Sequence, residues 1–238
     1  MHLTLLHVGE TPQRLRDRYE RFVPFFQTMF KDAGFTFDWH PVNVLDGEPL
    51  PAPDAVQGVV ITGSAYGVYD ETPWMEPLRR FIRDAYAART PMVGVCFGHQ
   101  IMADALGGDV GKSDKGWGIG RHTYRVIDRH GLALDRDAYA IACSHQDQVR
   151  VAPRDAQVFL ASEFTPNAGL VYGNGAAISV QPHPEFDRTF AKDLCELRRD
   201  NPLADAVVDQ AVNDLDAALD RLDMARTLGR FLTTRAAA

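Results

Sequence analysis

The stretch from Pro91 to Gly108 constrains the fold most, because it indicates a buried strand that turns directly into a helix. An apolar run follows the proline, and apolar side chains then recur at helical spacing, at Ile101, Met102, Ala105 and Leu106. Cys96 lies at the junction, with Gly94 and Gly98 two residues to either side. Glycines at these positions permit a sharp turn, so the sequence predicts an elbow that lifts the Cys96 side chain above a sheet.

A cysteine at such a junction has two interpretations. Its thiol would lie at a helix N-terminus, where unpaired N–H groups and the helix macrodipole favour negative charge on the sulfur. Alternatively, Cys96 is a small buried hydrophobic side chain, as a free cysteine at a strand end often is. The elbow alone leaves both interpretations open.

A second stretch, Ala177–Phe186, favours the first interpretation. It begins as an apolar strand and ends in the turn His183-Pro184-Glu185, which exposes a potential base and a carboxylate at one strand terminus. A nucleophilic cysteine needs a base to generate the thiolate and a third group to orient that base. Cys96, His183 and Glu185 therefore predict nucleophilic catalysis by a Cys-His-Glu triad.

The run Gly94–Gln100, followed farther along the chain by His183-Pro184-Glu185, resembles the class I (triad-type) glutamine amidotransferases. The resemblance covers roughly residues 1–190 and is nearest to a free-standing branch similar to the glutaminase domain of GMP synthetase and to the γ-glutamyl peptidases. It implies a hydrolase that cleaves the γ-amide of glutamine through a γ-glutamyl thioester on Cys96 and releases ammonia. It also implies a flavodoxin-like fold.

Two other functions stay open at this point. The same catalytic apparatus would serve a γ-glutamyl peptidase that acts on γ-glutamyl peptides or conjugates. A non-catalytic thiol sensor or chaperone could carry a cysteine elbow on the same kind of fold. Such a protein would not need His183 and Glu185, and this difference favours the enzyme.

The first sixty residues predict alternating strands and helices. Leu3–Val8 and Val59–Ile61 are apolar runs typical of buried parallel strands, and Phe35–Val42 predicts a strand between them. Helical spacing over 15–30 predicts a helix kinked at Pro24 and closed by Gly34. We therefore expect an α/β fold with a doubly wound, mostly parallel sheet flanked by helices, whose ligands bind beyond the carboxyl ends of the strands.

The loop Thr62–Gly67 follows the third strand and should reach the same edge of the sheet as Cys96. Glycine there is common in ordinary turns, but it also lets backbone N–H groups approach a substrate carbonyl. The resemblance implies an oxyanion hole made by the amides of Gly63 or Ser64 and of Phe97. A helix should follow, ending near Ala87; either Thr72 caps it, or Pro77 delays its regular start by a turn.

Between Ile119 and Val180 the pattern changes to short strands without helical period, which predicts a small antiparallel extension of the sheet. Ser144-His145-Gln146-Asp147 lies at the end of one of these strands. His145 is as consistent with a solvated turn as with a site, but the named branch carries a similar segment beside its substrate pocket. The resemblance implies substrate binding by Ser144 and His145, and also by Gln100, whose alternative is a helix-surface amide.

The C-terminal part is predicted to be helical. Helical spacing covers 186–199, Asn201-Pro202 interrupts it, and a second helix should run from about Ala204 to Thr233. We expect one domain over 1–238, with a core of about 1–190 and a helical extension of about 191–238. The last helix either packs on the domain or forms a homodimer contact. No synthetase signature follows, so any subunit that accepts ammonia would be another chain.

Composition and motif spacing argue against several classes of ligand and partner. The net charge of −7 and the lack of a Lys/Arg run argue against nucleic acid. Cys96, Cys143 and Cys195 lack metal-ligand spacing and fit free thiols in a reducing compartment, so no metal is expected. The segments Gly107–Ser113 and Gly116–Gly120 match neither nucleotide fingerprint, and no cofactor is expected. With no leader and no stretch of membrane-spanning length, the chain is expected to be cytoplasmic.

Overall fold

A computed structural model describes residues 1–19 and 22–236 of the chain. Within this part, nine strands form one twisted sheet in the order β2-β1-β3-β4-β11-β10-β9-β6-β7. The sheet has two halves of different character. In the parallel half the strands are β2 (Asp38–Asn43), β1 (His2–His7), β3 (Val59–Ile61), β4 (Met92–Val95) and β11 (Ala177–Val180). In the antiparallel half they are β10 (Gly169–Tyr172), β9 (Ala156–Ala161), β6 (Gly118–Val126) and β7 (Ala138–His145).

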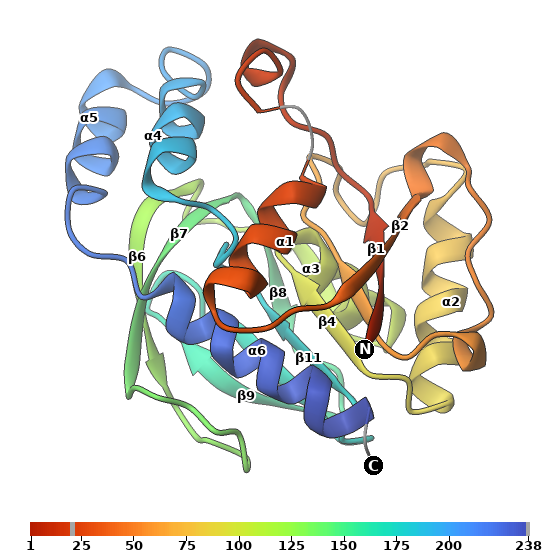
Figure 1. The fold of residues 1–238 in the computed structure, drawn as a ribbon. Helices are drawn as coiled ribbons and strands as arrows, with labels where there is room; N and C mark the ends of the chain where they lie inside the picture. Colours follow the sequence, from red (N-terminus) through yellow and green to blue (C-terminus); the bar gives the residue numbers. More distant parts are fainter. Residues whose placement is uncertain (20–21, 237–238) are drawn as a thin grey trace.

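Helices cover both faces of the sheet, as Figure 1 shows. They are α1 (Val23–Asp32), α2 (Met75–Ala87), α3 (Phe97–Ala105), α4 (Arg188–Glu196), α5 (Asp205–Asp214) and α6 (Arg221–Ala236). A separate two-stranded sheet pairs β5 (Asp109–Lys112) with β8 (Asp147–Val151). Short 3₁₀ turns occupy Gln13–Leu15, Val44–Asp46 and Pro53–Ala55. The arrangement is the expected α/β fold with an antiparallel extension and helical C-terminus.

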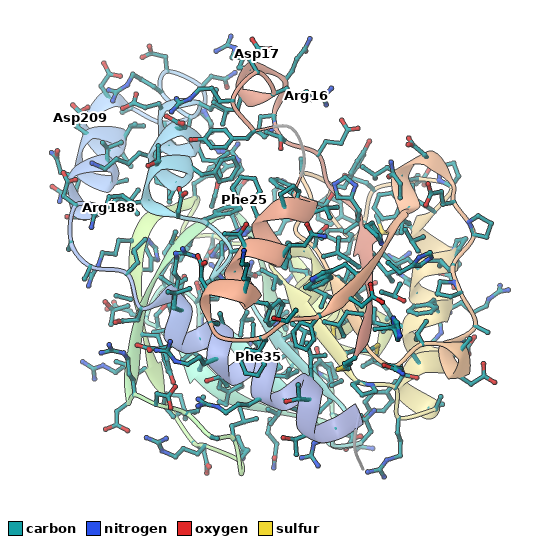
Figure 2. All side chains as sticks on the ribbon, in the orientation of Figure 1. Arg16, Asp17, Phe25, Phe35, Arg188 and Asp209 are labelled. Atoms are coloured by element: carbon teal, nitrogen blue, oxygen red, sulfur yellow. The ribbon has the colours of Figure 1, made fainter. Side chains whose placement is uncertain are left out.

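Alternation along the strands divides the core into two layers. Leu3 and Leu5 of β1 face the layer under α1 and α6, whereas Leu6 faces the layer under α2 and α3. Contacts between α1 and α6 close the first layer, and Phe35, labelled in Figure 2, packs so tightly on α6 that a Cβ at Gly229 would lie 2.4 Å from its ring. Burial on both faces is what parallel strands require.

Two predicted boundaries were wrong. The helix expected over 15–30 begins at Val23, and Pro24 lies in its first turn, where a missing N–H costs nothing, instead of kinking it. Residues 20–21 of that prediction lie outside the described residues. The strand expected from Phe35 begins at Asp38. The helix after Thr72 has the later of its two expected starts: it begins at Met75, with Trp74 as its N-cap.

The predicted final helix over 204–233 is two helices, α5 and α6, joined by a short connection. Asp220 in that connection lies against β7: its backbone N–H donates to Ala140 O at 2.7 Å, and its Oδ2 accepts from Ala140 N–H at 2.9 Å. The chain leaves the helix because this aspartate pairs with the outer edge of the sheet. Apolar spacing alone could not predict this break.

The described residues contain no helix that is long and apolar enough to cross a membrane.

Candidate active site

Cys96 occupies a strained elbow between β4 and α3. Its backbone has φ 54° and ψ −105°, a conformation that non-glycine residues rarely adopt and that is found mainly at functional sites. Both flanking positions require glycine, because neighbouring backbone atoms lie too close to leave room for a side chain. A Cβ at Gly94 would lie 2.5 Å from Gly98 O, and a Cβ at Gly98 would lie 2.3 Å from Ile61 O. The nucleophile candidate is thus held by the backbones of three neighbouring segments.

His183 and Glu185 follow the carboxyl end of β11 and are almost completely buried. The Nδ1 atom of His183 lies 2.6 Å from Glu185 Oε1, and its ring stacks on Phe186 with 3.9 Å between ring centroids and 6° between planes. A carboxylate and an aromatic ring therefore fix both the tautomer and the plane of the imidazole. With Nδ1 bonded to Glu185, Nε2 is the nitrogen left to serve Cys96 or a substrate.

Gly63 joins these two elements. A Cβ at Gly63 would lie 3.2 Å from His183 Cε1 and 3.6 Å from the Cβ of Cys96. The side chains of His183 and Cys96 therefore both approach Gly63, which has no side chain to separate them. The structure brings the three predicted catalytic residues together, although Cys96 lies almost ninety residues before His183 and Glu185 in the sequence.

Electrostatics keep a proton on His183. Burial lowers the pKa of its imidazole, but the charges on Glu185 and Cys96 and the hydrogen bonds with both outweigh it and raise the pKa from 6.5 to about 10. The imidazole of His183 is therefore protonated at neutral pH. In this state the histidine can donate a proton to a leaving group.

The backbone amides predicted for the oxyanion hole belong to the loop after β3 and to the start of α3. Among the described residues, the N–H groups of Gly63, Ser64 and Phe97 donate to no protein acceptor, whereas the neighbouring Gly98 N–H donates to Thr62 O. Phe97 N–H is the first amide of α3, where unpaired donors are normal. These free donors are of the kind that stabilises a developing oxyanion.

A contact with the antiparallel half also holds His183. Its backbone N–H donates to Ala142 O on β7 at 2.9 Å. Because β7 is the last strand of the sheet and β11 lies in its middle, this bond shows that the antiparallel half curls back toward the carboxyl end of β11. The two residues that follow Cys143 on β7, Ser144 and His145, consequently reach the site.

Cys96 opens into a cavity of about 490 Å³ formed between the two halves of the sheet. The predicted residues Ser64, Gln100, Ser144 and His145 all line it. The other lining residues are Ala65, Tyr66, Gly67, Tyr69, Asp70, Lys112, Trp117, Gln146, Asp147 and Arg198. A larger groove of about 550 Å³ lies between the segment 47–53, which contains three prolines, and α2. None of the triad residues lines it, so the candidate site is the cavity at Cys96.

Two of the predicted substrate-binding residues already form hydrogen bonds within the protein. Gln100 Nε2 donates to Asp147 O at 2.8 Å and to Gln181 Oε1 at 3.1 Å, which leaves only its Oε1 for a ligand. His145 Nδ1 lies 3.1 Å from the same Asp147 O, and its buried Nε2 has no partner among the described groups. Burial and the nearby His183 lower the pKa of His145 to about 3, so His145 is neutral and Nε2 is an acceptor.

Sequence reasoning missed several residues of the cavity wall, chiefly Trp117, Arg198, Tyr69 and Lys112. Trp117 lies just before β6 in the glycine-rich segment Gly116–Gly120, which matches no nucleotide-binding fingerprint, so no local motif indicated a site there. Arg198 follows α4 with no local motif around it. No group of three or more His, Cys, Asp or Glu side chains in the described part of the chain could hold a metal ion.

The fold and this arrangement define an α/β protein with a cysteine elbow at the carboxyl edge of its sheet, and the comparisons with known proteins give its family. The profile described as glutamine amidotransferase class-I matches residues 15–195. This chain belongs to the class I glutamine amidotransferase family.

Named relatives agree with the branch suggested by the sequence. Saccharomyces cerevisiae YLR126C, whose name assigns it to the glutamine amidotransferases, is 32% identical over 58% of this chain and 57% of its own length. Gamma-glutamyl peptidase 2 of Arabidopsis thaliana is 25% identical over 76% of this chain and 75% of its own. The GMP synthase [glutamine-hydrolyzing] of Trichormus variabilis is 28% identical over 68% of this chain, but the match spans only 30% of that protein.

A solved structure supports the fold. The glutamine amidotransferase of Thermotoga maritima superposes with a TM-score of 0.76 at 21% identity, over 99% of this chain and 97% of that one.

Proposed function

We propose that this chain hydrolyses the γ-amide bond of glutamine through a γ-glutamyl thioester on Cys96. The observation that carries the proposal is the meeting of the Cys96 elbow with the buried His183–Glu185 pair at Gly63, next to a cavity into which Cys96 opens. A structural cysteine would need neither the strained backbone nor the oriented imidazole.

In the first half of the proposed reaction, Cys96 Sγ attacks the γ-carbonyl carbon of the substrate and forms a C–S bond. The carbonyl oxygen becomes an oxyanion held by the N–H groups of Phe97 and of Gly63 or Ser64. When the C–N bond breaks, His183 gives its proton to the leaving nitrogen, which departs as ammonia. Proton transfer by a positioned histidine contributes about 10²–10⁴-fold to the rate.

In the second half, His183 is neutral and accepts a proton from a water molecule that attacks the thioester. The C–S bond breaks, glutamate leaves, and the imidazolium and thiolate are restored. Glu185 keeps Nδ1 protonated in both halves and so holds Nε2 in the correct tautomer.

A γ-glutamyl peptidase is the second candidate, and two observations favour it. The cavity of about 490 Å³ is within the range that accommodates drug-sized ligands, which is more space than a single amino acid needs. The Arabidopsis relative carries this activity in its name. The chemistry is identical, except that the leaving amine is then an amino acid or peptide.

We also propose where the reaction takes place and what receives its product. Cys96, Cys143 and Cys195 are unpaired, which suits a reducing compartment such as the cytoplasm. If ammonia is used for synthesis, a synthetase subunit accepts it.

Intact-mass spectrometry after rapid acid quench tests the proposal with glutamine and a γ-glutamyl dipeptide offered in turn. We expect a γ-glutamyl adduct that maps to Cys96, disappears in Cys96→Ala, and persists in Cys143→Ala and Cys195→Ala. Those two cysteines are matched controls because both are buried and neither lies at an elbow. If wild type forms no adduct and hydrolyses neither substrate, the non-catalytic thiol sensor becomes the better assignment.

A further inference from the structure

Arg198 is a cationic side chain of the active-site cavity to which the proposed reaction assigns no role. It lies just after the end of α4, is half-buried, and lines the same cavity as Cys96. Its guanidinium carbon stands 3.6 Å from the centroid of the Trp117 ring, another lining residue. Stacking on an aromatic face fixes the plane of a guanidinium and leaves its edges free for hydrogen bonds.

No protein acceptor uses those edges. In the described part of the chain, the guanidinium of Arg198 forms neither an ion pair nor a hydrogen bond, whereas the next residue, Arg199, pairs with Glu196, Asp205 and Asp209. Burial lowers the pKa of Arg198, and the charges of Cys195 and Cys96 act in the opposite sense. An arginine nevertheless remains protonated, so a partly desolvated positive charge stands without a counter-ion beside the nucleophile.

The other charged side chains of the cavity wall are less suited to bind an anion. Lys112 lies 3.6 Å from Asp147 and stands over the Tyr69 ring, so the second cation of the cavity already has a carboxylate nearby. Asp70 accepts from Gly67 N–H and would repel an anion. Arg198 is therefore the place in this wall where an incoming carboxylate gains most.

We propose that Arg198, held flat on Trp117, is the specificity residue that binds a carboxylate of the substrate. This inference rests on the proposed function and deepens it by naming the substrate class: γ-glutamyl compounds recognised through a free carboxylate. The carboxylate belongs either to the α-carbon of the glutamyl group or to the leaving amino acid. The planar guanidinium fork suits either because it can donate two parallel hydrogen bonds to one carboxylate.

Four substrates separate the two sources: glutamine, glutamine α-amide, γ-glutamylglycine and γ-glutamylglycinamide. Initial rates are measured for wild type, Arg198→Gln, Arg198→Lys and Trp117→Leu. Arg125→Gln is the matched control, since Arg125 is an exposed arginine of β6 with no side-chain bond in the described residues.

We expect Arg198→Gln to lower kcat/KM about 10- to 100-fold through KM, the range for losing a hydrogen bond between charged groups. If the leaving group carries the contacted carboxylate, γ-glutamylglycine loses this factor while glutamine and γ-glutamylglycinamide do not. If the α-carboxylate is contacted, every substrate except glutamine α-amide loses it. Arg198→Lys and Trp117→Leu should show smaller losses on the same substrates, because each retains a cation without its fixed plane.

Two results overturn the inference. One is an Arg198→Gln enzyme that matches wild type and Arg125→Gln on all four substrates. The other is an equal loss on all four, which assigns Arg198 a purely structural role. If wild type hydrolyses none of them, the proposed function fails separately, and calorimetric binding of γ-glutamylglycine and glutamate to Cys96→Ala decides the inference. Equal affinity with and without Arg198→Gln, or no binding to either protein, then overturns it.

Discussion

The two halves of the sheet contribute to one cavity in different ways. In the parallel half, the predicted reactive groups directly follow strand ends: Gly63 after β3, Cys96 after β4 and His183 after β11. In the antiparallel half, the residues that reach the cavity form its wall, with Trp117 just before β6 and Ser144 at the end of β7. Parallel strands present all their carboxyl ends at one edge, which is where α/β proteins place their ligands.

The difference teaches how chemistry and recognition can be separated within one sheet. The elbow at Cys96 is fixed by backbone contacts of Gly94 and Gly98, which tolerate no side chain. The antiparallel wall is made of side chains such as Trp117 and Ser144, which can change without moving the elbow. The hydrogen bond from His183 N–H to Ala142 O connects the halves, so the proposed base is aligned by both.

The largest effects should come from the parallel half. We expect His183→Ala to lower kcat by about 10²–10⁴-fold, because it removes the proton carrier. Glu185→Gln should cost less, since the carboxylate orients and supports the imidazole without carrying the proton. Steady-state kinetics test the order, with circular dichroism to show that both variants fold. Two variants as active as wild type would reduce His183-Pro184-Glu185 to a strand-terminating turn.

The second prediction contrasts the pH dependence of two buried histidines. The folded-state pKa of His183 is raised from 6.5 to about 10, so its contribution to the free energy of unfolding is complete below pH 6.5 and is lost as pH rises through about 10. The pKa of His145 is lowered to about 3, so its contribution is complete above pH 6.5 and is lost as pH falls toward 3. We therefore expect the stabilising contribution of His183 to be lost at alkaline pH and that of His145 to be lost at acid pH.

Urea unfolding at a series of pH values checks this contrast. His183→Gln should flatten the alkaline decline and leave the acid limb, and His145→Gln should do the reverse. Each slope is limited to about 1.4 kcal/mol per pH unit for one proton. Identical profiles for wild type and both variants would contradict the assigned protonation states.

The smallest effect is expected in the antiparallel wall. Ser144→Ala should raise KM by roughly tenfold or less, the value of one neutral hydrogen bond, and leave kcat unchanged. Ser113→Ala is a suitable control, because Ser113 is a half-buried serine that does not line the cavity at Cys96. A fall in kcat with KM unchanged would mean that Ser144 acts in the chemical step, and it would contradict the assignment of substrate recognition to the antiparallel half.

The sequence predicted best where a signal was local. The bounds of β3 and β11 are those of the apolar runs Val59–Ile61 and Ala177–Val180, and the strand-to-helix turn at Cys96 followed from its flanking glycines. The family, too, was recognisable from short motifs. The roles assigned to Gly63, Phe97 and the other site residues stay predictions. Among the predicted site residues, those that line the cavity are Ser64, Cys96, Gln100, Ser144 and His145.

What could not be predicted depends on contacts between distant segments. The break between α5 and α6 arises because Asp220 pairs with Ala140, eighty residues away in the sequence. Arg198 reaches the cavity only because α4 folds beside β6 and β7, where Trp117 lies under its guanidinium. Spacing within one helix contains no information about such partners, and tertiary contacts override it.

The pairing of β7 with Asp220 and His183 also bears on self-association. The outer edge of a terminal strand is a template on which a second chain can add a strand. In β7 the central groups of that edge are already used by Asp220 and by the backbone of His183, and in β2, at the other end of the sheet, Pro41 lacks an N–H to offer. Backbone pairing between copies is therefore opposed at both ends of the nine-stranded sheet, so a homodimer of this chain is not expected to extend that sheet.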